Sequence, residues 1–298
     1  MTADIVVVGS ANLDLVVDVD AVPVAGETVL GGDLRRIPGG KGANQAVAAA
    51  RLGRSVAMVG RIGDDDAGAL LRAALHTDGV DTSHLVTTPE APSGVAMIAV
   101  AADGDNAIVV SPGANGRLTA ADVESAAAVI GPAPIVLLQL KIPPEAVSTC
   151  AALARGLVIL NPAPARRLSP ELLSQVGVLV PNQRELATLT GHHGPVDQRV
   201  AATLSRSLPC RRVVVTLGSD GALVVDSDVT HVPAPMIAAV DTTAAGDSFC
   251  GALADALVGG AELVEATRWA VRAGAATAMR PGAQPSLPTR TEVDALTG

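Results

Sequence analysis

Short runs of apolar residues recur along the first two thirds of the chain, and stretches with helical spacing separate most of them. The runs are rich in Val, Ile and Leu, which is typical of strands buried on both faces of a parallel sheet. They span Ile5–Gly9, Ser55–Gly60, Ile135–Leu140, Leu157–Leu160, Gly177–Val180 and Arg212–Leu217. The helical stretches span Gly42–Leu52, Ala67–Leu75, Ala120–Ile130 and Glu145–Ala154. This alternation predicts an α/β fold with a mostly parallel sheet covered by helices on both faces.

Two pairs of segments depart from this alternation. Leu13–Asp18 and Glu27–Arg35 have the pattern of exposed strands joined by a Pro/Gly turn. Ser93–Ala101 and Asn106–Ser111 flank Asp103-Gly104, a dipeptide that favours a tight hairpin turn. Such β excursions from an α/β body indicate a small lid.

The last third of the chain has a different character. Two long Ala-rich helices are expected at Gly246–Leu257 and Ala261–Ala278, after a loop at Val240–Ala245. No low-complexity linker or internal repeat divides the chain. We therefore predict one domain over residues 1–298, with the lid formed by about residues 12–36 and 93–111.

Composition narrows the functional classes. Apolar residues make up 49% of the 298 residues, which excludes a disordered chain, and the net charge of −9 argues against a nucleic-acid partner. The three cysteines, Cys150, Cys210 and Cys250, are scattered and form no CxxC pair, so we expect no disulfide framework and no zinc site. The pattern predicts no signal peptide and no membrane span, and a cytoplasmic location.

A glycine-rich segment, Gly39-Gly40-Lys41-Gly42-Ala43-Asn44, opens a predicted helix. Glycines let the backbone approach a ligand closely, and a helix N-terminus favours polar or anionic groups. The segment matches neither the Walker A loop nor the dinucleotide-binding fingerprint. A ligand-binding loop and a plain glycine-rich turn both fit it.

A second motif, DTTAAGDSF, spans Asp241–Phe249 and leads into a helix whose first turn holds Asp247. Free backbone N–H groups at that helix start can form an anion hole for a phosphoryl group in transfer. Asp247 stands where a general base would take the proton of an attacking hydroxyl. An Asp that only complements the helix dipole would give the same local pattern.

Two further motifs follow strand ends, the edge at which ligands bind in parallel sheets. The segment from Asn182 to Glu185 fits either a position near a ligand or a capping box at a helix start. The segment Thr216–Gly221 fits either a nucleotide-contacting loop or a glycine turn between hairpin strands.

In combination, these motifs resemble the ribokinase-like, PfkB-type family of carbohydrate kinases over almost the whole chain. The matching segments, in the family's order, are Ser10–Asp14, Gly39–Gly53, Asn161–Ala165, Asn182–Glu185, Thr216–Gly221, Asp241–Phe249 and Gly282–Ser286. The resemblance implies a three-layer α/β/α sandwich with a mostly parallel central sheet and a small β-sheet lid. It also implies an ATP-dependent kinase that acts on a sugar.

The resemblance implies a role for each matching position. Asp247 would be the general base, and Ala244, Ala245 and Gly246 the anion hole. The positions that would contact the sugar are Asn12, Asp14, Gly40, Lys41, Gly42, Asn44, Lys141 and Asp247. Those that would contact ATP are Asn182, Glu185, Thr216, Leu217, Gly218, Ser219, Asp220, Gly221 and Gly246.

The resemblance further implies two metal ions and a partner. Mg²⁺ would lie near Glu185 and be held indirectly. K⁺, as an activating monovalent cation, would be held mostly by backbone oxygens at Asp241, Thr243, Thr277, Arg280, Gly282 and Ser286. The lid would cover the sugar and pair in a homodimer.

Lys141 departs from the family's pattern. The family has at this position a Glu that accepts a hydrogen bond from a sugar hydroxyl, whereas an ammonium group only donates. Lys141 could turn outward, pair with Asp14 or favour a different sugar.

The resemblance leads us to expect phosphorylation of D-ribose, or of a ribose-like sugar, at the primary 5-hydroxyl. A kinase for another sugar or for a nucleoside is an alternative. Nucleoside kinases commonly stack the base on aromatic side chains, and this chain offers only Phe249 and Trp269. We expect Trp269 in the core or in the wall of the nucleotide pocket. A non-catalytic sugar or nucleotide sensor on the same fold is a third interpretation.

Overall fold

The computed structural model of the chain describes residues 3–101, 103 and 105–296. Its first strand, β1 (Ile5–Val8), divides its side chains between two hydrophobic clusters. Ile5 and Val7 pack into one cluster, and Val6 and Val8 pack into the other. Because successive side chains of a strand point to opposite faces, the sheet that contains β1 is buried on both sides.

This main sheet has nine strands in the order β13-β12-β11-β10-β9-β8-β1-β4-β5. Neighbouring strands are parallel from β5 to β11, and the last two pairings, β11–β12 and β12–β13, are antiparallel. The remaining strands are β4 (Val56–Gly63), β5 (Asp81–Thr88), β8 (Ile135–Leu138), β9 (Leu157–Leu160), β10 (Val178–Leu179), β11 (Val213–Thr216), β12 (Ala222–Val225) and β13 (Val229–Val232).

Helices cover both faces of the main sheet. A helix is assigned to the face whose hydrophobic cluster contains its buried side chains. The first side has α1 (Lys41–Arg51), α2 (Asp66–Thr77), α9 (Ala245–Val258), α10 (Leu263–Ala278) and α11 (Arg290–Ala295). The second side has α3 (Ala120–Ser125), α4 (Ala127–Ile130), α5 (Pro144–Leu153), α6 (Pro170–Gln175), α7 (Gln183–Thr190) and α8 (Gln198–Arg206). Short 3₁₀ helices are η1 (Gly113–Arg117), η2 (Gly218–Asp220) and η3 (Gln284–Ser286).

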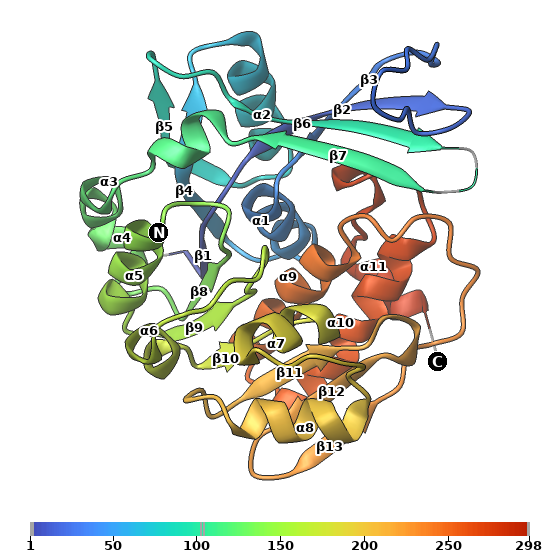
Figure 1. The fold of residues 1–298 in the computed structure, drawn as a ribbon. Helices are drawn as coiled ribbons and strands as arrows, with labels where there is room; N and C mark the ends of the chain where they lie inside the picture. Colours follow the sequence, from blue (N-terminus) through green and yellow to red (C-terminus); the bar gives the residue numbers. More distant parts are fainter. Residues whose placement is uncertain (1–2, 102, 104, 297–298) are drawn as a thin grey trace.

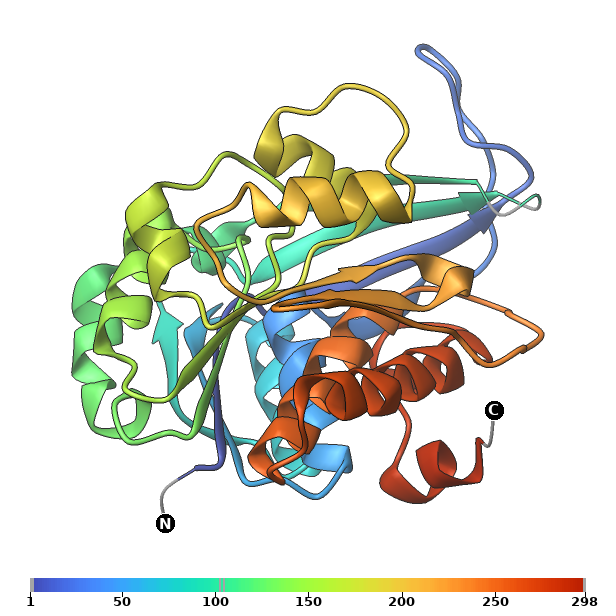
Figure 2. The same cartoon turned by 90° about the horizontal axis from the view of Figure 1, so that it is seen from below.

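A separate four-stranded sheet has the order β3-β2-β6-β7. Its strands are β2 (Asn12–Val19), β3 (Arg35–Gly39), β6 (Gly94–Ala101) and β7 (Asn106–Ser111). The strands β2, β6 and β7 project together beyond the main body, as both views show (Figure 1, Figure 2). We call this sheet the small sheet. The predicted fold class, a mostly parallel α/β sandwich with a small β-sheet beside it, is confirmed.

Two predicted elements are wrong in detail. The segment Glu27–Arg35 is not a strand: the partner of β2 is β3, and only an isolated bridge joins Gly31 to Val19. Residues 24–34 are exposed, so no apolar cover favours an extended strand there. The stretch Ala120–Ile130 is not one helix, because it breaks at Ala126 into α3 and α4.

The second predicted hairpin has the expected strands, and β6 and β7 pair antiparallel up to Val100 and Asn106. Of its predicted turn, Asp103 is described, whereas Gly104 lies outside the described residues. Among the described helices, none is long and apolar enough to cross a membrane.

Candidate active site

The buried carboxylate of Asp247 lies where α1 and α9 begin. Its Oδ2 accepts a hydrogen bond from Asn44 Nδ2 at 2.9 Å, and its Oδ1 accepts one from Gln45 Nε2 at 3.1 Å. The Nζ of Lys41 is 3.9 Å from the same Oδ1. The two helices pack closely because Gly251 has no side chain: a Cβ there would lie 3.0 Å from the carbonyl oxygen of Gln45. Two motifs far apart in the sequence therefore meet in one site.

The start of α9 presents free backbone donors. Its N-cap, Ala244, has φ +61°, and it is the sole non-glycine residue with positive φ in the described part of the chain. Of the three residues expected to form the anion hole, Ala245 already donates its N–H to the carbonyl of Thr242, whereas the N–H groups of Ala244 and Gly246 have no protein acceptor among the described residues. The N–H of Asp247, which was not expected in the anion hole, has none there either. A Cβ on Gly246 would meet no atom within 4 Å. Unpaired N–H groups that border open space are suited to an anion.

The start of β2 meets the glycine-rich segment. Asn12 is buried, and its Oδ1 accepts a hydrogen bond from Asn115 Nδ2 at 2.9 Å, which assigns the other end of the Asn12 side chain as the amide donor. Asn115 also bonds to both backbone groups of Ala11. Gly40 has φ +94°, and a Cβ there would lie 2.6 Å from the backbone nitrogen of Asn12. Asn115 lies outside the motifs, and sequence reasoning missed it.

Two buried polar atoms near this segment have no hydrogen-bond partner in the described part of the chain. They are Oδ1 of Asn44 and Oγ of Ser10. Buried polar atoms are nearly always hydrogen-bonded, so an unpaired acceptor beside Asp247 favours a ligand that carries hydroxyl groups.

Four charged side chains influence one another at this site. Burial raises the pKa of Asp14 to about 6, although the charge of Lys141 acts in the opposite direction and that of Asp247 adds to the rise. Burial and the charge of Lys41 lower the pKa of Lys141, an effect that Asp14 and Asp247 oppose. The charge of Asp247 raises the pKa of Lys41. Lys141 is half-buried, and it forms no salt bridge with Asp14 within the described residues. Its charge is thus within the electrostatic reach of Lys41, Asp14 and Asp247.

The segment from Asn182 to Glu185 begins α7 as a capping box, one of its two interpretations, and its place near a ligand stays a prediction. The two residues form a capping box at the start of α7, with Asn182 Oδ1 accepting from the Glu185 N–H and Glu185 Oε2 accepting from the Asn182 N–H, each at 2.8 Å. The Glu185 carboxylate is also within the electrostatic reach of the site. Burial raises its pKa, the Asn182 N–H and Lys41 lower it, and Asp247 raises it.

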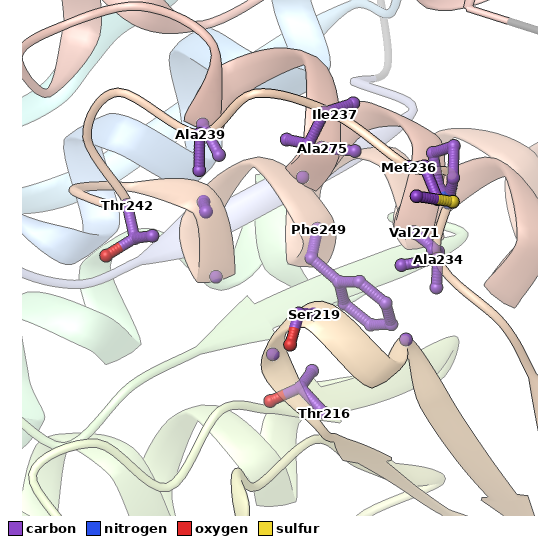
Figure 3. Close-up of a pocket in the computed structure, with 17 residues that line it drawn as sticks. Thr216, Ser219, Ala234, Met236, Ile237, Ala239, Thr242, Phe249, Val271 and Ala275 are labelled. Atoms are coloured by element: carbon purple, nitrogen blue, oxygen red, sulfur yellow. The ribbon is translucent and has the colours of Figure 1, made fainter.

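A pocket of about 430 Å³ adjoins the start of α9. Four residues of the expected nucleotide loop line it, and they are Thr216, Gly218, Ser219 and Gly221. Phe249 and small residues of α10 form the opposite side, and Figure 3 shows the Phe249 ring pointing into the pocket between Ser219 and Val271. The loop from Ala234 to Ala239 completes the wall. A mostly apolar slot built of small residues suits a flat ring system.

Two residues of the expected nucleotide loop do not line the pocket, and Trp269 lies against the core. Leu217 is buried in the second hydrophobic cluster, and Asp220 is exposed, so neither lines the pocket. Of the two places expected for Trp269, the core is the one observed: it packs against the first hydrophobic cluster and not in the pocket wall, and its Nε1 donates to Asp255 at 2.8 Å. The guanidinium groups of Arg272 and Arg290 lie over the Trp269 ring.

Asp241 ties the loop before α9 to the segment after α10. Its Oδ1 accepts from the Thr243 N–H and its Oδ2 from the Gly282 N–H, both at 2.8 Å. Burial favours the neutral acid, but the two hydrogen-bonding residues outweigh it, and the pKa of Asp241 falls below its ordinary value. The backbone N–H of Arg280 donates to the carbonyl of Thr277 at the end of α10. An ionised carboxylate thus lies beside a helix C-terminus, where carbonyl oxygens collect.

In the part of the chain that the structure describes, no cluster of three or more His, Cys, Asp or Glu side chains could hold a metal ion. Any cation at this site would therefore depend on backbone oxygens, on single carboxylates or on a ligand's own oxygens.

Comparisons with known proteins identify the family to which the chain is similar. The family model described as pfkB family carbohydrate kinase matches residues 2–290. A ribokinase of Bacillus subtilis is 40% identical, with 98% of this chain and 99% of the relative covered, and one of Haemophilus influenzae is 39% identical, with 98% and 97% covered. The solved structure of Arabidopsis thaliana ribokinase complexed with ribose and ATP is 33% identical and superposes with a TM-score of 0.90, covering 99% of both chains.

Proposed function

The chain belongs to the pfkB family of carbohydrate kinases, and from this we propose that it transfers the γ-phosphoryl group of ATP to the 5-hydroxyl of D-ribose, giving ribose 5-phosphate and ADP. One observation carries the proposal. The buried Asp247 carboxylate directly follows the unpaired N–H groups at the start of α9, so a base and an anion-binding site lie at one point.

Asp247 acts as the general base in this mechanism. Each of its oxygens accepts one amide hydrogen bond, from Asn44 or Gln45, and a carboxylate oxygen has a second lone pair for the sugar hydroxyl. The hydroxyl gives its proton to Asp247 as its oxygen attacks the γ-phosphorus in line. The N–H groups of Gly246 and Asp247 then stabilise the charge on the transferring phosphoryl group.

The two substrates approach this point from opposite sides. Asn12, Asp14 and Asn44 offer a donor, a carboxylate and an unpaired acceptor to the sugar hydroxyls, with Gly40, Lys41, Gly42 and Lys141 around them. The apolar pocket beside Phe249 takes the adenine ring, so the phosphates extend towards α9.

The residues present fit a Mg²⁺ ion held mainly by the nucleotide. Glu185 uses Oε2 in its capping box, which leaves Oε1 for a water of the hydrated ion. Mg²⁺ commonly keeps several waters and binds one or two carboxylates together with substrate phosphates. The ion would neutralise charge on the phosphate oxygens during transfer.

The Asp241 loop fits a monovalent cation such as K⁺. Asp241 is ionised, and the C-terminus of α10 adds the negative end of a helix dipole. The remaining proposed ligands are Thr243, Thr277, Arg280, Gly282 and Ser286. Because Thr243 directly precedes Ala244, a cation there would hold the turn that presents the free N–H groups.

We further propose a homodimer through the small sheet, which acts as a lid over the sugar, and a cytoplasmic location. Exposed apolar side chains on β6 and β7 support the dimer: Met97, Ile108, Val109 and Val110. The free thiols of Cys150, Cys210 and Cys250 support a reducing compartment.

The deciding experiment measures ATP consumption with D-ribose, 2-deoxyribose, fructose, arabinose and nucleosides, with and without K⁺. We expect D-ribose to be turned over most efficiently and K⁺ to raise the rate. Efficient turnover of another compound in its place would overturn ribose as the substrate and would make Lys141 the first residue to test. No turnover of any compound would overturn the kinase proposal.

A further inference from the structure

Behind Asp247, two glutamine side chains form a hydrogen-bonded chain. Gln139 Nε2 donates to Gln45 Oε1 at 2.6 Å, and Gln45 Nε2 donates to Asp247 Oδ1 at 3.1 Å. Both glutamines have an exposed fraction of 0%, so water does not compete for these bonds. We propose that Gln139 and Gln45 form an amide relay whose fixed direction orients the general base, and that both are positioning residues. The inference rests on the proposed function of Asp247.

The direction of the relay follows from the charge at its end. An ionised carboxylate only accepts hydrogen bonds, so Gln45 must present Nε2 to Asp247. Its Oε1 then points away and needs a donor, which Gln139 Nε2 supplies. If Gln45 turned its amide over, an amide oxygen would face a carboxylate oxygen. Gln139 therefore stabilises the orientation of Gln45 that keeps a donor on Asp247.

The main sheet brings Gln139 to this position. Gln139 comes directly after β8, and Gly9 comes directly after β1. The two residues are neighbours because β1 and β8 pair in the sheet, with Val8 opposite Leu138. A Cβ on Gly9 would overlap Oε1 of Gln139, so the glycine leaves the space that this side chain occupies. Oε1 of Gln139 has no hydrogen-bond partner within the described residues. Buried polar atoms are nearly always hydrogen-bonded, yet Gln139 makes a hydrogen bond through Nε2 and none through Oε1 to any described residue. We infer that the bond to Gln45 sets the position of the Gln139 side chain.

Other groups near Asp247 carry charge or titrate. Lys41, Glu185, Asp14 and Lys141 influence it electrostatically, and the buried thiol of Cys250 is one turn further along α9. The relay differs from all of these because amides do not titrate. It therefore supplies the same donor to Asp247 at every pH at which the enzyme works.

The kinetic test inverts the relay with Gln139→Glu. When ionised, the introduced carboxylate accepts only, so Gln45 would turn its Nε2 away from Asp247; when protonated, the introduced acid would donate and keep the relay intact. We expect kcat of this variant to fall as the pH rises and the introduced carboxyl group ionises. The wild type should not show this decrease. Gln139→Leu leaves Gln45 Oε1 without its donor, so that Gln45 no longer holds Nε2 on Asp247 and one charge-assisted hydrogen bond to the base is lost. We expect this variant to lose roughly tenfold in kcat at all pH values, without a pH dependence of its own. The KM for ATP should not change in either variant.

The matched control is Gln175→Glu, the same substitution at an exposed position at the end of α6. It should keep the wild-type pH profile. A Gln139→Glu variant with the wild-type profile and the wild-type kcat would overturn the relay.

A second measurement does not depend on turnover. With ¹⁵N-labelled glutamine, the side-chain amide resonances of Gln45 and Gln139 can be assigned from their loss in single variants. We expect Asp247→Asn to move the Gln139 resonance, although the two residues form no direct hydrogen bond, and to leave that of Gln175 unchanged. A Gln139 resonance that does not move would overturn the relay. If Asp247→Asn moves the Gln139 resonance but the wild-type protein phosphorylates no sugar, the relay stands and the kinase proposal fails.

Discussion

Lys41 and Asp247 face each other across the junction of α1 and α9, with Lys41 Nζ 3.9 Å from Asp247 Oδ1. The carboxylate raises the pKa of Lys41, so the ammonium group stays charged through neutral pH. A fixed positive charge beside the base compensates for the desolvation of a buried carboxylate. The mechanism requires Asp247 as a carboxylate, and Lys41 provides the positive charge that lies beside it.

The first prediction concerns the base itself. Asp247→Asn keeps the shape of the side chain and cannot take the proton, so kcat should fall by roughly 10²–10⁴-fold, the usual contribution of a general base. The KM values for sugar and ATP should change little. A coupled assay of ADP release measures the effect, and the thermal midpoint checks that the variant is folded. A folded variant with near-normal kcat would contradict the assignment.

The second prediction tests the anion hole. A Cβ on Gly246 would meet no protein atom within 4 Å, so Gly246→Ala should leave the thermal midpoint unchanged. The methyl group would occupy space that the phosphoryl group needs, and we expect kcat to fall by about 10²-fold, as when one oxyanion donor is lost.

The control is Gly116→Ala, where a Cβ would lie in ordinary contact, 3.6 Å from Pro112. Both variants should be equally stable, and only Gly246→Ala should be slow. Full activity of Gly246→Ala would place the phosphoryl group elsewhere.

The sequence predicted the elements whose apolar pattern is unambiguous. The runs around β1 and β8 are continuous stretches of Val, Ile and Leu, and both are strands within a residue or two of the expected bounds. The strand predicted at Glu27–Arg35 is wrong because its apolar side chains, among them Leu30 and Leu34, are exposed and have no packed neighbour among the described residues that would hold the segment extended. Whether an apolar face is covered depends on the tertiary structure.

The sequence also predicted the motifs of the site but not the residues that support them. Asp247 and Asn44 stand in recognisable segments. Gln139 and Asn115 have no local signal, because their roles depend on hydrogen bonds to Gln45 and Asn12, 94 and 103 residues away. Buried polar side chains are informative only once their neighbours are known.

The third prediction concerns the proposed dimer. Val109 on β7 is 60% exposed and lies opposite Met97 on β6, which is 49% exposed. If this face is an interface, Val109→Asp should place a charge in it and halve the mass measured by sedimentation equilibrium.

Val229→Asp is the matched control, since Val229 is an exposed valine on β13 of the main sheet. Its mass should equal that of the wild type. A wild type that sediments as a monomer would contradict the dimer.

The fourth prediction follows from the pKa of Asp14, which is raised from 3.8 to about 6. Below pH 6 the carboxyl group gains a proton and loses acceptor capacity for sugar hydroxyls. The KM for ribose should therefore rise as pH falls below 6, while the KM for ATP should not. Asp14→Asn should have a high KM for ribose that does not vary with pH. A wild-type KM for ribose that stays constant as the pH is lowered through the pKa of Asp14 would contradict the role.

The same shift has a consequence for stability. Because the pKa of Asp14 is higher in the folded than in the unfolded state, the folded state binds more protons between pH 3.8 and about 6. The contribution of Asp14 to stability therefore decreases as pH rises through this window. Urea unfolding of Asp14→Asn across the same range should lack this decrease.

The last prediction isolates Lys141. Its charge lowers the pKa of Asp14, so Lys141→Met should raise that pKa further. The increase in the KM for ribose should then begin at a higher pH than in the wild type. Lys141→Arg keeps the charge and should keep the wild-type midpoint, which separates charge from the length of the side chain. An unchanged midpoint in Lys141→Met would mean that the two groups are uncoupled, and the effect of residue 141 on sugar choice would then have to come from direct contact with the sugar.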